Sequence, residues 1–387
     1  MRIRSLTLTN FRSYKSASFN FDSFETILVG SNASGKTSIL EGIVLLSTAK
    51  GFRSDHDYEM IAFGSEVGRV RGEIEITDYP IHPLSDKPIN TEDVAERQIL
   101  EIVLTPGLVM NVPAPMKKYT VNGVPKHMAD FAGQLLTVLF WPEDLELVNG
   151  SPSLRRKYLD HVLIQSDREY RRNLLSYERG IRQRNRLLEM VRDEGANPAQ
   201  LLFWDQLLIK NGNYITKKRE EYISYINNYQ FQITNYPLMN NQITYDRSII
   251  SEERLYQYKN AEVASGTTLV GPHRDDIKFK IKNHKLDIKS NDDFLDLKLF
   301  GSRGEQRLAI LWVKLAELSY LEKVTGDNPI LLLDDIFSEL DHVHQDLVFK
   351  MIGNHQTILT TTDENLLKHK KLKNSTVIRL PGLTPSS

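Results

Sequence analysis

The sequence predicts an α/β protein with mixed parallel and antiparallel sheet and a separate helical lobe. Three observations support this prediction. A strand-like run at 25–29 leads into a glycine-rich loop at 30–37 and then into an apolar, helix-like run. Asn122-Gly123 separates two β-prone runs, a spacing typical of an antiparallel hairpin because both turn residues tolerate positive φ. From Ser151 onward, apolar residues recur at helical spacing without sustained heptads.

The composition is that of a globular protein without cysteine chemistry. The 387 residues suggest two or three domains, and 40% hydrophobic with 26% charged residues argues against a disordered or fibrous chain. The absence of cysteine excludes disulfides, thiolate catalysis and cysteine metal sites. The 49 basic and 50 acidic side chains give a net charge of −1, so an acidic partner needs a local basic patch. With no signal-peptide pattern and no run long enough to span a membrane, we expect a cytoplasmic location.

Residues 1–150 are predicted to form the N-terminal part of a head domain. They read mainly as strands with one helix between them, and the apolar residues of the strands are spaced for sheet at 17–21, 70–76 and 99–104. The Asn122-Gly123 turn adds antiparallel sheet to this part.

A helical lobe is predicted for residues 151–240, and the rest of the head for 241–387. Ser151 can cap a helix and Pro152 fits its first turn, while the helical pattern breaks at 195–198. Strands are expected to return from about Thr267. A helix near 303–323 and apolar strands at 330–333 and 357–359 follow.

The glycine-rich loop has the P-loop pattern in the context that this pattern requires. Its glycines let successive backbone N–H groups point at a phosphate, and the following helix adds the positive end of its dipole. Lys36 is expected to reach the β- and γ-phosphates, and Thr37 to supply a hydroxyl to Mg²⁺. The loop therefore predicts an ATP site with Mg²⁺. Its residues are Gly30, Ser31, Asn32, Ala33, Ser34, Gly35, Lys36, Thr37 and Ser38.

A second candidate site, formed by two carboxylates, follows the apolar strand at 330–333. Asp334 ends this strand, where a carboxylate can hold Mg²⁺ through water opposite Thr37. Asp335 occupies the next position, where a general base could orient an attacking water. The alternative, that the two carboxylates only cap the strand, stays open for the motif taken alone.

A serine-glycine motif precedes the helix expected near 303–323. Ser302 with Gly301 and Gly304 at a helix start is an anion-binding arrangement, because free N–H groups and a hydroxyl converge there. A plain helix cap explains the same residues equally simply. Its position shortly before the acidic strand makes it a candidate signature motif, and Ser338-Glu339-Leu340-Asp341 after that strand is similar to a D-loop.

The order of these motifs along the chain resembles the SMC-like branch of the ABC ATPases. The P-loop comes first, the candidate signature motif follows far along the chain, and the acidic strand and Ser-Glu-Leu-Asp come last. Finer stretches spread over nearly the whole chain resemble the RecF family within that branch. The most specific are Leu8 to Tyr14, Gly271-Pro272-His273-Arg274-Asp275-Asp276, Ser302 to Arg307 and Leu331 to Asp341. The resemblance implies an ABC-type P-loop ATPase head with a helical second lobe in place of a long coiled coil.

The resemblance also implies how the site residues work. Ser302 and Gly304 of one subunit are expected to touch the γ-phosphate held by the P-loop of another, so that ATP is buried in a homodimer. Glu305 and Asp341 belong to the same expected nucleotide site, and Asp335, Lys36 and Ser302 are the expected catalytic residues. Arg12, after the first strand, either approaches the ATP phosphates or is a surface turn arginine. His273 and Arg274 lie in a specific stretch without a chemical role that follows from the residues.

The function implied by the RecF resemblance is an ATP-dependent DNA clamp. Such a protein acts with RecO and RecR on gapped and single-stranded DNA, promotes recombinase loading and affects replication restart and the SOS response. Two features depart from common ABC ATPases. Asp335 replaces the usual glutamate, from which we expect slow turnover, and the segment 357–363 offers hydroxyls instead of a switch histidine. A transporter motor is disfavoured because Lys36 and Ser302 are 266 positions apart.

A local basic excess predicts where DNA binds. Between Ser151 and Met190 there are ten Lys/Arg against five Asp/Glu, an excess of five. Arg179, Arg182 and Arg186 have helical i, i+3, i+7 spacing, so they share one face and could follow phosphates without reading bases. The alternative is a solvated helix face whose arginines pair with neighbouring acids.

Overall fold

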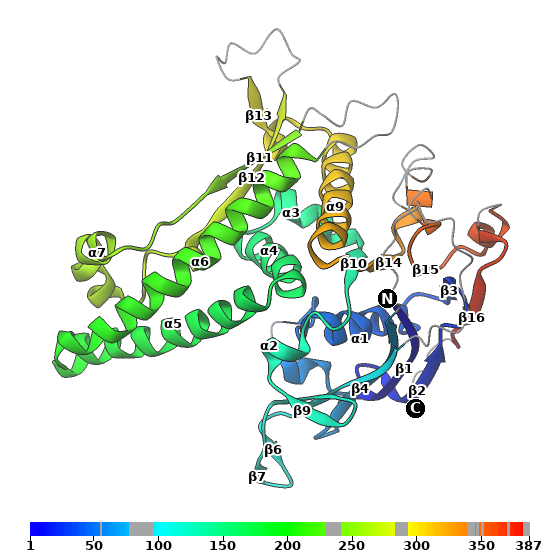
Figure 1. The fold of residues 1–387 in the computed structure, drawn as a ribbon, viewed down its shortest axis with the longest axis horizontal. Helices are drawn as coiled ribbons and strands as arrows, with labels where there is room; N and C mark the ends of the chain where they lie inside the picture. The colour runs from blue at the N-terminus through cyan, green and yellow to red at the C-terminus, as the bar shows by residue number, and fades with distance from the viewer. Residues whose placement is uncertain are drawn as a thin grey trace, which may run out of the picture. The chain divides into compact units, whose positions relative to one another are not determined.

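The computed structural model describes residues 1–54, 56–76, 96–229, 241–282, 293–338, 345, 348–349, 352–369 and 372–381. The chain divides into two compact units, Met1–Pro142 with Leu321–Ser387, and Glu143–Tyr320. The first unit is an α/β domain and the second is mainly helical (Figure 1). The three-part division at residues 150 and 240 stays a prediction, and the helical unit takes in residues up to Tyr320.

The first unit contains an antiparallel sheet with the strand order β2-β1-β4-β5-β8-β9. Alternating burial along β4 shows that one face of this sheet packs into a core. Asn122 and Gly123 have φ of 51° and 78°, which confirms the tight hairpin predicted between β8 and β9. The strands of the sheet are β1 (Arg2–Phe11), β2 (Tyr14–Asn20), β4 (Gly68–Ile76), β5 (Glu96–Leu104), β8 (Lys117–Val121) and β9 (Val124–Lys126).

A second, parallel sheet of the same unit has the order β10-β14-β15-β3-β16. β14 and β15 are buried along their whole length, as expected for strands that are covered on both faces. The C-terminal ends of strands β3, β14 and β15 lie at the same edge of the sheet, because the three strands are parallel. The strands are β3 (Glu25–Val29), β10 (Thr137–Phe140), β14 (Ile330–Asp334), β15 (Thr357–Thr361) and β16 (Thr376–Arg379).

Helix α1 (Lys36–Thr48) contacts strands of both sheets and forms the centre of the first unit (Figure 1). Gly42 permits the close approach, because a Cβ at this position would lie 2.9 Å from a methyl carbon of Leu8. Nearly every residue of α1 is buried, Thr37 excepted. Shorter elements complete the unit: β6 (Leu108–Val109), β7 (Val112–Pro113), α2 (Met128–Phe131) and the 3₁₀ turns η1 (Asp57–Met60), η6 (Ile336–Ser338) and η7 (Glu364–Lys368).

The second unit is built on two long antiparallel helices that lie side by side (Figure 1). The first, α5 (Arg168–Glu194), ends at Gly195 with φ 68°, which confirms the predicted break. Pro152 begins α4 as expected, although the Ser151 hydroxyl contacts the Ser153 hydroxyl and does not cap the helix. The helices and turns that lie wholly or mostly in this unit are η2 (Pro142–Leu145), α3 (Glu146–Asn149), α4 (Pro152–Ser166), α5, η3 (Pro198–Gln200), α6 (Leu201–Asn228), α7 (Glu252–Ser265), η5 (Pro272–Arg274), α8 (Leu297–Phe300) and α9 (Arg303–Thr325).

A small antiparallel sheet, β11-β12-β13, completes the second unit. Its strands are β11 (Asn241–Asp246), β12 (Asp276–Lys282) and β13 (Phe294–Asp296). The prediction that strands return from about Thr267 was wrong, since β11 begins at Asn241 and α7 follows it. β11 is short and has a single buried residue, Ile243, so alternation in the sequence was too weak to reveal it.

In the described residues no helix is long and apolar enough to cross a membrane. The same residues contain no cluster of three or more His, Asp or Glu side chains arranged to hold a metal ion.

Candidate nucleotide site and nucleic-acid interface

The predicted P-loop lies between β3 and α1. Ala33 and Gly35 have φ of 63° and 94°, so the backbone bends sharply at both positions. The Ser34 N–H donates to the Ser31 carbonyl at 3.2 Å, while α1 starts at Lys36 without a side-chain cap. The Ser34 hydroxyl is buried and has no hydrogen-bond partner in the part of the chain that the structure describes. An orphaned hydroxyl and an uncapped helix N-terminus fit a phosphate group.

The Lys36 side chain folds back over this loop. Its Nζ donates to the carbonyl oxygens of Gly30 at 2.7 Å and Ser31 at 2.9 Å. Burial lowers the pKa of Lys36, and the nearby carboxylates of Asp335 and Asp334 act against this shift. The P-loop cation and the acidic pair at the end of β14 therefore belong to one electrostatic site.

Tyr14 supports the P-loop from strand β2. Its hydroxyl lies 3.4 Å from the Ser34 carbonyl oxygen, to which it donates. A Cβ atom at position 35 would lie 2.5 Å from this hydroxyl oxygen, closer than real Cβ atoms come to any neighbour. Burial raises the pKa of Tyr14 to about 12, so the hydroxyl keeps its proton at neutral pH. Gly35 is thus required both by its positive φ and by the tyrosine against it.

The acidic pair is held by the neighbouring strand. Asp334 is 5% exposed, and its Oδ1 accepts a hydrogen bond of 2.6 Å from the Thr360 hydroxyl. Asp335 has a φ of 49°, a left-handed conformation that is strained for a residue with a side chain. Burial raises the pKa of Asp335, whereas Lys36 and the backbone N–H of Thr362 lower it. Asp335 is therefore a more basic carboxylate than one on an open surface.

Oxygen donors suited to Mg²⁺ are present at this edge. Asp334 makes its one side-chain hydrogen bond through Oδ1, and the Thr37 hydroxyl makes none, within the stretches that the structure describes. Carboxylate and hydroxyl oxygens are hard ligands of the kind that Mg²⁺ prefers. The donor set therefore fits the predicted metal, with the carboxylate Oδ2 and the hydroxyl open.

Arg12 is already engaged with α1. It lies in the β1–β2 turn with a φ of 51°. Its Nε and Nη2 donate to the two carboxylate oxygens of Glu41, at 2.7 and 2.8 Å, and its Nη1 donates to the Glu59 carbonyl at 2.8 Å. Glu41 is completely buried, so this pair ties the turn to the P-loop helix. A contact between Arg12 and ATP stays a prediction.

The candidate signature motif forms a capping box at the start of α9. The Glu305 N–H donates to the Ser302 hydroxyl at 3.3 Å, while the Ser302 N–H donates to the Glu305 carboxylate at 2.7 Å. The motif is therefore a helix cap, and because Ser302, Gly304 and Glu305 are also exposed, its role as a signature motif stays a prediction. Two large apolar side chains before it, Leu299 and Phe300, are 73% and 43% exposed. The motif lies in the second compact unit and the P-loop in the first.

The expected D-loop aspartate, Asp341, lies outside the described residues. Of the Ser338-Glu339-Leu340-Asp341 segment, only the backbone of Ser338 is described, at the end of η6. Its place in a nucleotide site stays a prediction.

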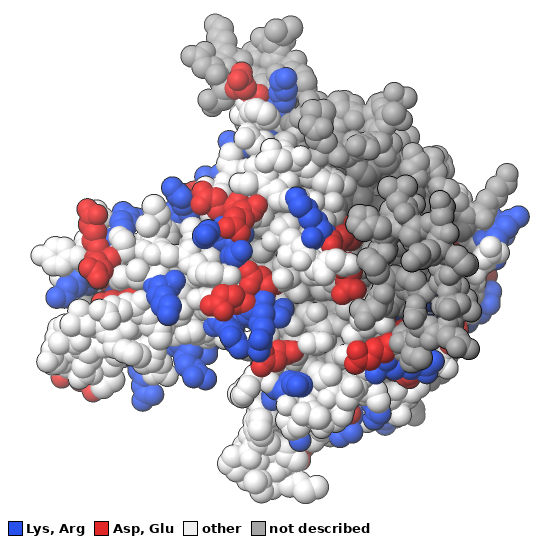
Figure 2. Space-filling model, viewed as in Figure 1, with Lys and Arg blue, Asp and Glu red and all other residues white. Residues whose placement is uncertain are grey.

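The predicted DNA-binding arginines are on the surface of α5. Arg179, Arg182 and Arg186 are exposed and have no ion-pair partner in the part of the chain that the structure describes. The local basic excess is smaller on the surface than in the sequence, because Arg155, Arg171 and Arg184 are at most 8% exposed. Figure 2 shows Lys and Arg interspersed with Asp and Glu on the visible face, without a continuous basic surface.

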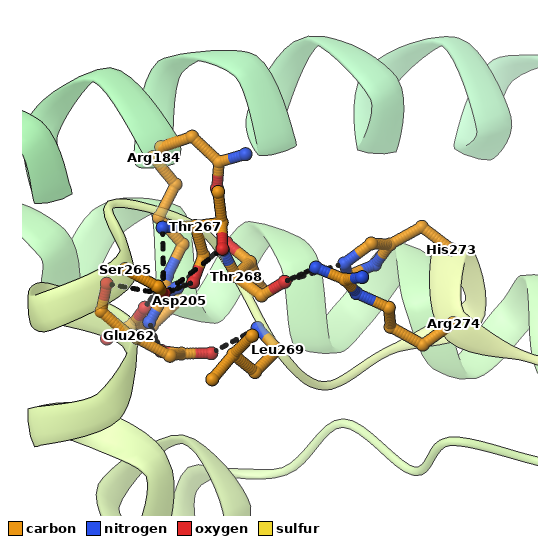
Figure 3. Close-up of polar contacts among 10 residues, drawn as sticks. Arg184, Asp205, Glu262, Ser265, Thr267, Thr268, Leu269, His273 and Arg274 are labelled. Atoms are coloured by element: carbon orange, nitrogen blue, oxygen red, sulfur yellow. Dashed lines mark hydrogen bonds and ion pairs between the residues drawn. The ribbon is translucent and has the colours of Figure 1, made fainter.

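Arg184 belongs to a buried polar cluster between the helices. Its Nη2 donates to Glu262 at 2.7 Å, its Nε to Asp205 at 2.7 Å and its Nη1 to the Thr268 hydroxyl at 2.9 Å. His273 and Arg274 both contact the Thr268 carbonyl oxygen, at 3.0 and 3.1 Å (Figure 3). The polar contacts in Figure 3 thus run from α5 to the segment that leads into β12. His273 and Arg274 therefore hold the segment before β12 in place.

The two aspartates of the Gly-Pro-His-Arg-Asp-Asp segment also bind arginines within the second unit. Asp275 accepts a hydrogen bond of 3.0 Å from Arg219, and Asp276 accepts two from Arg155, at 2.6 and 3.0 Å. Buried charges need such partners. The segment is therefore a joint between α4, α6 and β12, and its carboxylates are not open to a metal or substrate.

Sequence reasoning missed Thr360 and Tyr14 as neighbours of the nucleotide site. Thr360 could have been found from its place at the end of an apolar strand, where parallel strands bring polar side chains together. Tyr14 follows a turn before a β-prone run, and nothing in that pattern indicates a contact with a loop twenty residues later.

The chain is similar in sequence to curated proteins over nearly its full length. Residues 2–379 match the model of the RecF/RecN/SMC N terminal domain. The DNA replication and repair protein RecF of Lachnoclostridium phytofermentans is 34% identical over 371 residues, covering 94% of this chain and 93% of its own. RecF of Thermomicrobium roseum is 34% identical over 414 residues, covering 98% of both chains.

Solved structures agree with this result. The recombination mediator protein RecF-ATPrS of the RecFOR pathway matches with a TM-score of 0.78 at 29% identity, covering 98% of this chain and 96% of that one. A RecF-ATP structure matches with a TM-score of 0.77 at 30% identity, over 94% and 92% of the two chains. These matches confirm the predicted α/β ABC-type head with mixed sheets and a helical lobe. The chain therefore belongs to the RecF family of DNA replication and repair proteins, within the RecF/RecN/SMC group.

Proposed function

We propose that this chain is an ATP-dependent DNA-binding protein of replication and recombinational repair, which dimerises when it binds ATP. The observation that carries the proposal is the P-loop, which brings together Lys36, the uncapped N-terminus of α1 and a Ser34 hydroxyl that has no hydrogen-bond partner among the described residues. The similarity to RecF proteins solved with ATP and ATPrS supports the nucleotide.

The residues of the first unit have distinct roles in this proposal. Lys36 leaves the carbonyls of Gly30 and Ser31 and binds the β- and γ-phosphates, because a phosphate is the better partner for an ammonium group. Thr37 and Asp334 hold Mg²⁺, which when bound neutralises phosphate charge. Asp335 orients the attacking water as a general base. Its shorter side chain, compared with glutamate, favours slow hydrolysis that resets the dimer.

A second copy of the chain completes the site. Ser302 and Gly304 of one subunit contact the γ-phosphate bound by the other, and Glu305 and Asp341 lie in the same interface. The exposure of Ser302 and Gly304 supports this, since both are open to a partner. The exposed Leu299 and Phe300 directly before the motif add apolar surface that a partner would cover.

DNA binds through its backbone to α5. Arg179, Arg182 and Arg186 share one exposed face, and the exposed Arg172 lies on the same helical stripe, seven residues before Arg179. From Arg172 to Arg186 the helix rises about 21 Å, enough to follow several phosphates. No base-reading contact is needed, so single-stranded and gapped duplex DNA bind without sequence preference.

Partners of the RecFOR pathway complete the proposed function. The similar RecF structures belong to this pathway. On this basis, the ATP-bound dimer works with RecO and RecR to promote recombinase loading on gapped DNA and so contributes to SOS induction.

Sedimentation velocity with ATP, ADP and no nucleotide tests the ATP-dependent dimer. We expect the wild-type chain to dimerise only with ATP. Lys36→Met should stay monomeric because it binds no nucleotide, and Ser302→Arg should stay monomeric although it binds ATP. Dimerisation of Ser302→Arg at the wild-type ATP concentration would refute the interface. Gly353→Ala is a matched control, because a Cβ at Gly353 meets no atom within 4 Å.

Salt dependence tests the DNA contact. Replacing Arg179, Arg182 and Arg186 by glutamine removes three phosphate contacts and should reduce the slope of log Kd against log salt by about 2.7. Fluorescence anisotropy with a gapped duplex measures this slope. The Arg192→Gln variant is the control, because Arg192 lies at the end of α5 and pairs with Asp193. An unchanged slope would move the DNA interface to another surface.

A further inference from the structure

Strand β15 lies between the two halves of the nucleotide site. It pairs with β14, which ends in the acidic pair, and with β3, which leads into the P-loop. Thr360 is the parallel partner of Asp334, and the Thr361 carbonyl accepts a hydrogen bond of 3.3 Å from the Gly30 N–H. The end of β15 is therefore bonded to the start of the P-loop and to the acidic strand.

Thr360 contacts both residues of the acidic pair. Its hydroxyl donates to Asp334 Oδ1 at 2.6 Å. The Thr360 hydroxyl oxygen also accepts a hydrogen bond of 3.0 Å from the Asp335 N–H. This N–H contacts the Thr360 carbonyl oxygen as well, at 3.2 Å. Thr360 is 1% exposed, so water does not replace these bonds easily.

Two consequences follow for the acidic pair. The bond to Oδ1 fixes the rotation of the Asp334 carboxylate, and among the described residues nothing is hydrogen-bonded to Oδ2. The bonds to the Asp335 N–H hold the backbone in its strained left-handed conformation at φ 49°. One hydroxyl thus sets both the direction of the proposed metal ligand and the backbone of the proposed base.

We propose that Thr360 is a positioning residue, which aims Asp334 at Mg²⁺ and holds Asp335 beside the nucleotide. This inference rests on the proposed function, because it needs a magnesium nucleotide at the P-loop. It goes further by giving a role to the hydroxyl-rich segment 360–362 at the end of β15. The Thr362 N–H, which contacts the Asp335 carboxylate, belongs to the same support.

The test compares the affinity for ATPγS in excess Mg²⁺ and in excess EDTA, measured by calorimetry on the full chain. Thr360→Val keeps the shape of the side chain but loses the hydroxyl. We expect it to lose at least about tenfold of the Mg²⁺-dependent gain in affinity, with the affinity in EDTA unchanged. Thr360→Ser keeps a hydroxyl and should restore the gain.

Thr26→Val is the matched control. Thr26 is 1% exposed on β3 of the same sheet, and its hydroxyl has no hydrogen-bond partner in the described residues. The same substitution there should leave the Mg²⁺-dependent gain at its wild-type value. This control separates the loss of the Thr360 contacts from a general effect of a valine in the sheet.

The outcomes are distinguishable. If wild type gains no affinity from Mg²⁺, the proposed function fails and this inference with it. If wild type gains affinity and Thr360→Val gains as much as Thr26→Val, only the role of Thr360 is overturned. Should Thr360→Val not fold, Thr360→Cys gives the same comparison, because a thiol is a weaker hydrogen-bond donor of similar size. A wild-type Mg²⁺-dependent gain in affinity in this variant also overturns the role of Thr360.

Discussion

The Arg184 guanidinium donates a hydrogen bond of 2.7 Å to the Glu262 carboxylate, and both side chains are buried between helices of the second unit. Two residues earlier on the same helix, Arg182 is exposed. The two arginines are equivalent in charge and opposite in environment, so they separate a structural effect from a binding effect.

Arg184→Met should destabilise the chain by about 3–5 kcal/mol, because it leaves Glu262 and Asp205 without their charge partner. Arg182→Met should change stability by less than about 0.5 kcal/mol, as is usual for an exposed position. Urea denaturation measures both values. DNA affinity should respond in the opposite sense, falling for Arg182→Met and not for folded Arg184→Met. Equal stability losses in the two variants would contradict the buried cluster.

Gly35→Ala should abolish tight nucleotide binding. The new Cβ would lie 2.5 Å from the Tyr14 hydroxyl oxygen at a φ of +94°, so the loop must shift away from its present path. We expect ATPγS affinity to fall by at least about a hundredfold, which corresponds to about 2.8 kcal/mol. Calorimetry measures this loss.

Gly64→Ala is the control for backbone strain alone. Gly64 has a φ of +78°, and a Cβ there meets no atom within 4 Å. This variant should lose about 1–2 kcal/mol of stability at unchanged nucleotide affinity. The double variant Tyr14→Ala, Gly35→Ala should recover part of the affinity, because the clash is gone and only the strain remains. No recovery would show that strain dominates.

The sequence predicted the parts of the site that depend on neighbours in the chain. The P-loop could be found because its glycines, Lys36 and Thr37 have fixed spacing between a strand and a helix. The acidic strand could be found because the four residues at 330–333 form one apolar run that is followed by two carboxylates. The hairpin at Asn122-Gly123 likewise depends only on local backbone conformation.

The parts that depend on tertiary pairing could not be predicted. The bond between Thr360 and Asp334 exists because β14 and β15 pair in one particular register. Arg184 is one of the ten basic residues in the local excess at 151–190, yet it is buried, seven residues after the buried Tyr177 and four before the buried Leu188. This helical spacing can be read from the sequence. The partner that makes burial of Arg184 possible, Glu262 on α7, cannot.

The pair of Arg12 and Glu41 should be energetically coupled. The side chain of Arg12 is 22% exposed and that of Glu41 is completely buried, so removing the arginine leaves an unpaired buried carboxylate. Arg12→Leu should cost about 3 kcal/mol, and the double variant Arg12→Leu, Glu41→Met should cost less than this single change. A double-mutant cycle in urea measures the coupling. Additive effects would contradict the ion pair as the main role of Arg12 in the protein without nucleotide.

His273 should give the chain a pH-dependent stability. Burial lowers the pKa of His273 from 6.5 to about 4, and its two ring nitrogens contact the Tyr177 hydroxyl and the Thr268 carbonyl oxygen. Between these two pH values the unfolded chain binds more protons than the folded chain. The contribution of neutral His273 is therefore complete above pH 6.5 and is lost as the pH falls towards 4.

His273→Gln should remove this dependence. Its free energy of unfolding should fall less steeply than that of wild type between pH 6 and pH 4.5, by up to about 1.4 kcal/mol per pH unit. Urea denaturation at several pH values measures the difference, in which other titrating groups cancel. His127→Gln is the control, because His127 is exposed before α2 and the substitution should leave the slope as in wild type. If His273→Gln and wild type lose stability in parallel, His273 binds its proton over the same pH range in the folded and the unfolded chain, which would contradict a lowered pKa.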